Sequence, residues 1–82
     1  MTTVYEHFKA QADKSYTNAR NALTANIAQA YANDGEKWDR RAGLLTLEEG
    51  QADVADICVN VLVEETDLRA RGIADMIAGR KE

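Results

Sequence analysis

The sequence contains no proline and only one cysteine. Because proline breaks helices, its absence leaves long helical segments uninterrupted. The lone Cys58 has no partner for a disulfide within the chain, which excludes a disulfide-stapled secreted scaffold and favours a reducing compartment. The first residues show no basic segment followed by an apolar run, and no run approaches the ~20 apolar residues that span a bilayer. We therefore expect a cytoplasmic protein without a membrane segment, in the host cytoplasm if the chain is viral.

Side chains that carry catalysis or bind metals are also scarce. His7 is the only histidine and lies far in sequence from Cys58, so a nucleophile paired with a base has little support. Zinc and di-iron sites need several Cys, His or Glu-x-x-His ligands, and the scattered glycines form no phosphate loop. We expect Cys58 to be a small buried core residue and His7 to be exposed. The sequence predicts no enzyme, no metal site and no cofactor.

What the sequence does contain is material for helices in one domain, residues 1–82. Fourteen of its residues are alanine, the strongest helix former. An apolar stripe with helical spacing predicts a first long helix from about Thr3 to Ala32, ended by Asn33-Asp34-Gly35. The residues of this stripe are Phe8, Ala12, Tyr16, Ala19, Leu23, Ile27 and Ala30.

A second long helix is predicted from Thr46 to about residue 79. Thr46 and Glu49 have the spacing of a capping box, which marks a helix start. The β-branched run Ile57–Val63 is a competing strand signal, which we reject because no second strand is available to pair with it. Residues 36–45 are expected to form a short helix, with a loop pinned by Trp38 as the alternative. The apolar side of the second helix comprises Val54, Ile57, Cys58, Val61, Leu62 and Leu68.

These segments predict an all-α fold, an antiparallel helical hairpin of two long helices joined by a short helical or looped connection. A two-helix hairpin cannot cover its own apolar stripes, because each helix has only one neighbour. We therefore expect two chains to assemble as a dimeric four-helix bundle.

The charge of the chain is unevenly distributed. The net charge is −4, yet residues 46–67 contain seven acidic residues and no basic one. Steps of three and four residues place five of these acidic residues, together with Asn60, on one side of the predicted second helix. The set is an ordinary solvated helix face or a negative ridge that meets a basic surface on another protein. Its residues are Glu49, Asp53, Asp56, Asn60, Glu64 and Asp67.

A small basic cluster, Lys37, Arg40 and Arg41, flanks Trp38, but Glu36 and Asp39 are interleaved with it and are expected to cancel its charge. Domains that bind nucleic acid usually carry a clear positive surplus, which a chain of net charge −4 lacks. We therefore expect no direct contact with nucleic acid.

The leading hypothesis is a small acidic protein-binding module, an inhibitor that masks a partner's basic surface, including a surface that normally receives nucleic acid. Inhibitors of this type occur in phages and mobile elements, for example as anti-defence proteins. The first alternative is a structural or assembly subunit that acts by homo-oligomerisation. The second alternative is a small transcriptional regulator that uses Trp38, Arg40 and Arg41 near DNA.

Overall fold

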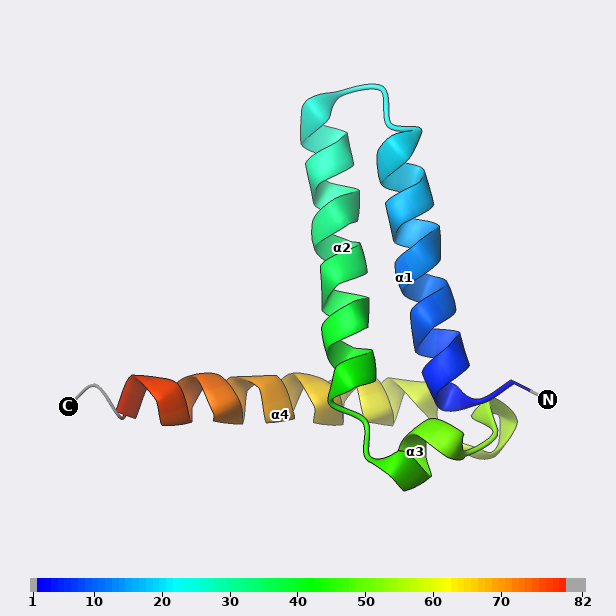
Figure 1. Cartoon of the computed structure of the whole chain (residues 1–82), viewed down its shortest axis with the longest axis vertical. Helices are drawn as coiled ribbons and strands as arrows, with labels where there is room; N and C mark the ends of the chain where they lie inside the picture. Colours follow the sequence, from blue (N-terminus) through cyan, green and yellow to red (C-terminus); the bar gives the residue numbers. More distant parts are fainter. Residues whose placement is uncertain (1, 80–82) are drawn as a thin grey trace.

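The computed structural model describes the backbone of residues 2–79 and the side chains of residues 2–76. Over this range its regular structure is helical apart from one isolated bridge, which confirms the all-α class. Helices α1 and α2 form an antiparallel hairpin, and α4 lies across the foot of that hairpin (Figure 1). The elements in chain order are α1 (Val4–Arg20), α2 (Ala25–Gly43), α3 (Leu47–Gln51), the 3-10 turn η1 (Val54–Asp56) and α4 (Val59–Gly79).

The hairpin turn lies inside the segment that was expected to be one helix. The prediction of a helix from Thr3 to Ala32 is wrong, because α1 ends at Arg20 and the chain reverses over residues 21–24. The turn is made by caps rather than by glycine or proline. The backbone N–H of Asn21 donates to the carbonyl of Thr17 at 3.2 Å, and the Thr24 hydroxyl accepts from the N–H of Ile27 at 3.2 Å.

Gly35 lies within α2 instead of ending a helix. It is buried, and a Cβ atom added there would lie 2.8 to 3.0 Å from three ring atoms of Tyr16. The absence of a side chain at Gly35 therefore lets α1 and α2 approach each other closely. The helical prediction for residues 36–45 is confirmed as far as Gly43, but that stretch continues α2 and is not a separate short helix.

The second expected helix is also interrupted. The capping box is confirmed, since the Thr46 hydroxyl accepts from the N–H of Glu49 and the Glu49 carboxylate accepts from the N–H of Thr46. The helix that begins there, α3, ends at Gln51, and α4 begins only at Val59. The intervening chain pairs with the start of α1, where the N–H of Val4 donates to the carbonyl of Ala52 at 2.9 Å. A single helix from Thr46 to about residue 79 is therefore wrong.

The hydrophobic core is small and lies where the three longer helices meet. Its buried members are Val4 and Phe8 of α1, Ala42 of α2 and Leu62 of α4. The Phe8 ring packs edge-on against Trp38, with ring centroids 5.3 Å apart.

Several residues differ from their expected burial. Cys58, expected in the core, is exposed, and His7, expected to be exposed, is half-buried. Val61 and Leu68, expected on the apolar side of the second helix, are 53% and 62% exposed. The reason is that α4 turns another face, with Leu62 and buried Thr66, toward the hairpin.

The molecule is flat and open. Its extents are 43 × 40 × 16 Å and its Cα radius of gyration is 14.6 Å, whereas a compact chain of this length has about 12 Å. The accessible surface is 5914 Å², and a compact protein of this mass exposes about 4,900 Å². Large apolar side chains occupy part of the additional surface. They are Tyr5, Leu23, Ile27, Tyr31, Leu47, Val61, Leu68, Ile73 and Met76.

Replacement of two helical glycines by alanine is expected to have opposite effects on stability. Gly35→Ala should lower the free energy of unfolding by about 1–2 kcal/mol, because the new methyl group displaces the Tyr16 ring. Gly72→Ala should raise it by about 0.5–1 kcal/mol, because alanine favours the helix and nothing lies within 4 Å of the added atom. Urea denaturation followed by circular dichroism measures both. A gain in stability at Gly35 would contradict the close packing of α1 on α2.

Candidate functional site

The six residues expected to form one acidic stripe are distributed over several elements. Glu49 is in α3, Asp53 precedes η1, and Asp56 is within η1. Asn60, Glu64 and Asp67 are the members that α4 carries. The predicted stripe along one helix is wrong, because the non-α segment between Gln51 and Val59 separates α3 from α4.

Three of these carboxylates are used within the fold. Arg69 donates to both oxygens of Glu49, at 2.7 and 2.9 Å. These bonds, together with the backbone hydrogen bond at Thr46, lower the pKa of Glu49 to about 2. Arg41 donates to both oxygens of Asp67, at 3.0 and 3.2 Å, and thereby lowers the pKa of Asp67. Asp53 accepts from the N–H of Ala55 at the start of η1.

The remaining members of the set, Asp56, Asn60 and Glu64, are exposed. Asp56 belongs to η1, whereas Asn60 and Glu64 belong to α4. They therefore do not form the continuous ridge that the sequence suggested.

The basic cluster of α2, in contrast, is separated from one of its acidic neighbours, Asp39. Lys37 and Arg41 are one helical turn apart and line one hollow facing α4, together with Arg40. Asp39 lies on the side of α2 that faces α1, where it accepts from Lys9 at 2.8 Å and from the Tyr16 hydroxyl at 3.1 Å. The expected cancellation is therefore wrong for Asp39, whose carboxylate is turned toward α1 and away from the basic hollow.

The crossing of α2 and α4 brings a further cation to this cluster. Arg71 of α4 lines the same hollow, which has a volume of about 260 Å³. Arg41 is held in place there, since its guanidinium lies 4.6 Å above the Trp38 ring and pairs with Asp67. Among the described residues, Lys37, Arg40 and Arg71 form no ion pair.

An apolar hollow of about 350 Å³ adjoins this basic one. Arg40 and Ala70 line both hollows, so the two lie side by side. In Figure 1, α4 continues past the foot of α2, which leaves the C-terminal part of the helix uncovered on this side. Ile73 in that part is 48% exposed. We call the combined surface the corner groove, which is lined by Lys37, Arg40, Arg41, Leu44, Asp67, Ala70, Arg71, Ile73 and Ala74.

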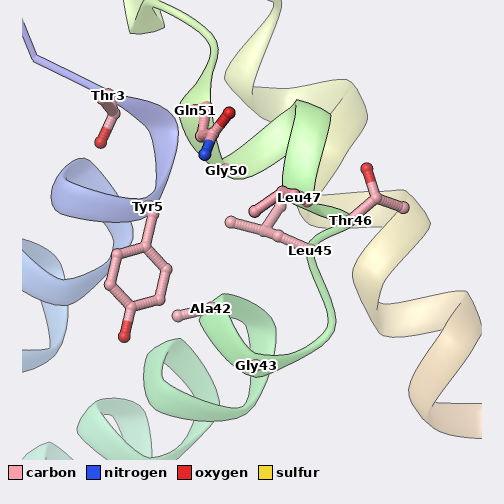
Figure 2. A pocket seen from close by; sticks show the side chains of 9 residues that line it. All are labelled: Thr3, Tyr5, Ala42, Gly43, Leu45, Thr46, Leu47, Gly50 and Gln51. Carbon is pink, nitrogen blue, oxygen red and sulfur yellow. The ribbon is translucent and has the colours of Figure 1, made fainter.

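A separate hollow of about 480 Å³ lies between the start of α1, the end of α2 and α3, and we call it the α3 hollow. Figure 2 shows Tyr5 on one side of it and Leu45 and Leu47 on the other. Tyr5 is 48% and Leu47 77% exposed. No charged side chain lines this hollow within the described chain, so its chemistry suits an apolar side chain from another molecule. The residues shown are Thr3, Tyr5, Ala42, Gly43, Leu45, Thr46, Leu47, Gly50 and Gln51.

Comparison with protein families, with characterised proteins and with solved structures finds no match for this chain. Within residues 2–79, no three histidine, cysteine or acidic side chains are grouped as a metal site would require. None of the described helices combines the length and the apolar character needed to cross a membrane.

The ion pair between Glu49 and Arg69 should give the protein a measurable pH dependence. The carboxylate pKa is about 2 in the fold and 4.5 without these partners. The stabilisation is therefore complete above pH 4.5 and is lost as the pH falls from 4.5 toward 2. We expect Glu49→Gln to lower the free energy of unfolding by about 1–2 kcal/mol at neutral pH, and the difference from wild type to shrink over that range.

Urea denaturation at a series of pH values provides this comparison. Glu64→Gln is the matched control, because Glu64 is exposed and forms no ion pair within the described residues. Equal losses of stability for the two variants at neutral pH would contradict the assigned role of the Glu49 pair.

Proposed function

We propose that this chain is a small, non-enzymatic protein-binding module whose partner covers apolar surface that the open fold leaves exposed. The observation that carries the proposal is the extent of that surface. The chain exposes roughly 1,000 Å² more than a compact protein of its mass. One side of a typical specific protein interface buries about 800 Å². The additional surface is therefore of the size that one partner would cover.

The exposed apolar side chains are concentrated in a few places. One group is at the hairpin tip, where Leu23 is 96% exposed. A second borders the α3 hollow, and a third follows α4 and includes Ile73 in the corner groove. Solvated apolar surface of this kind marks sites of association rather than of catalysis. This exposed apolar surface supports a binding role, which needs no catalytic or metal-binding side chains.

An inhibitory role of the phage or mobile-element type is compatible with such a module and remains part of the proposal. We place its contact surface on other residues than the predicted acidic set, because Glu49 and Asp67 are engaged within the fold. The binding surface that we propose consists of exposed apolar side chains. Among them, Leu47 lines the α3 hollow and Ile73 lines the corner groove.

Affinity capture from the native or infected host, followed by calorimetry with the purified partner, tests this proposal. Wild type should enrich a specific protein, and Ile73→Glu or Leu47→Glu should weaken its binding at least about tenfold, because a charge enters an apolar contact. Ala10→Glu is the matched control, because Ala10 is exposed on α1 and lines neither hollow. No enriched protein, or equal binding by all variants, would refute the proposal.

A second candidate function is self-assembly, the structural alternative drawn from the sequence. Val61 and Leu68 lie seven residues apart on α4 and are both more than half exposed. This spacing places them on one face, while Leu62 and Thr66 are buried against the hairpin. Gly72 follows Leu68 by one turn and has open space around it. The outer face of α4 could therefore pack against the same face of a second copy.

Light scattering tests self-assembly directly. If α4 pairs with its copy, wild type should have twice the monomer mass, and Leu68→Glu should return it to the monomer. The Ala10→Glu variant should leave the dimer intact, because its charge is placed on an exposed part of α1. A wild-type monomer at every accessible concentration would remove this second candidate.

A further inference from the structure

We propose that the corner groove binds an acidic amphipathic helix of the partner protein. This inference deepens the proposed binding function, on which it rests, by naming the surface used and the chemistry of the partner. Two features of the groove carry it: cations that form no ion pair among the residues the structure describes, and an apolar floor beside them.

One of the four cations of the groove is held by contacts within the fold, and the other three form no ion pair among the described residues. The Arg41 side chain is only 15% exposed, and it is fixed by Asp67 and by the Trp38 ring. Asp67 balances one of the four cations that line the basic hollow, so the lining residues carry a net formal charge of about +3. Asp75, one helical turn beyond Arg71, forms no ion pair with it.

The floor of the groove suits the apolar face of a helix. Leu44 and Ile73 provide apolar surface, and the small side chains of Ala70 and Ala74 allow another backbone to approach closely. An amphipathic helix that docks in a groove uses apolar residues at helical spacing, with polar residues on its flanks. Carboxylates on the flank beside the cations would lie near Lys37 and Arg71. Acidic charge on the partner is therefore the expected complement.

A nucleic acid fits this groove less well. A duplex site needs several phosphate contacts and a positive surplus, whereas the groove offers three available cations on a chain of net charge −4. Trp38 does not provide a platform for bases, because Arg41 covers its ring and Phe8 packs against it. The apolar floor would also remain uncovered beside a phosphate backbone.

A displayed library of helical peptides tests the inference on the full chain. Each peptide carries leucine at every third or fourth position, and the flanking positions are randomised among Glu, Gln and Lys. We expect selection to enrich Glu on one flank. The double variant Arg40→Glu/Arg71→Glu should bind the best enriched peptide at least about tenfold more weakly. The same peptide with Lys on that flank should bind the double variant better than it binds wild type.

Lys14→Glu is the control for a general charge effect, since Lys14 is an exposed cation on α1 and lines no part of the groove. Circular dichroism checks that the double variant keeps the helix content of wild type, because a carboxylate at position 71 lies one turn from both Asp67 and Asp75. Arg40→Gln/Arg71→Gln, which adds no carboxylate, replaces it if helix content falls. The inference is overturned if no peptide is enriched, if enriched flanks lack Glu, or if the double variant binds equally well. Binding of a short DNA duplex that competes with the peptide and is lost in the double variant would overturn it in favour of nucleic acid.

Failure of this inference differs from failure of the proposed function. A captured native partner that binds the double variant as tightly as wild type leaves the binding function standing and removes the corner groove as its site. The absence of any captured partner removes the binding function itself. If wild type is a dimer and the double variant is a monomer, the occupant of the corner groove is a second copy of this chain and not an acidic helix of another protein.

Discussion

The guanidinium of Arg69 joins parts of the chain that are distant in sequence, and the open shape depends on it. It donates to the carbonyl of Leu44 at the end of α2, at 2.9 Å, and to both oxygens of Glu49 in α3. A contact to Glu65, one turn back on α4, completes its set of partners. An Arg–carboxylate pair with two parallel hydrogen bonds fixes orientation as well as distance. Arg69 therefore links α4 to the end of α2 and to α3, beside the Arg41–Asp67 pair and the packing of Leu62 in the core.

This crossing explains both the charge and the apolar character of the surface. Because α4 passes α2 near Ala70, its preceding turns bury Leu62 and Thr66, and its following turns continue without a neighbour. The same crossing places Arg71 beside the cations of α2. The basic rim and the apolar floor of the corner groove therefore have one cause. Helix α4 is longer than the surface on which it packs, and its C-terminal part extends into solvent. A partner that covered this extension would replace the water that now contacts Ile73.

The sequence predicts local features of this fold better than its three-dimensional arrangement. The helical class and the Thr46 capping box depend on neighbouring residues, and both are confirmed. The turn at residues 21–24 was missed because the alanine-rich stripe keeps its spacing through a turn made only by caps. The spacing of Lys37, Arg40 and Arg41 indicates a shared helix face, from which Asp39 is turned away. The contribution of Arg71 depends on where α4 crosses α2, which no local pattern encodes.

In this fold α4 crosses a short hairpin instead of running antiparallel to one long helix. Small-angle X-ray scattering of the monomer, separated by size-exclusion chromatography, tests it most directly. We expect a flat particle with two long dimensions, near 43 and 40 Å, and a third near 16 Å. A rod with a single long axis, or a compact particle with a radius of gyration of about 12 Å, would contradict it.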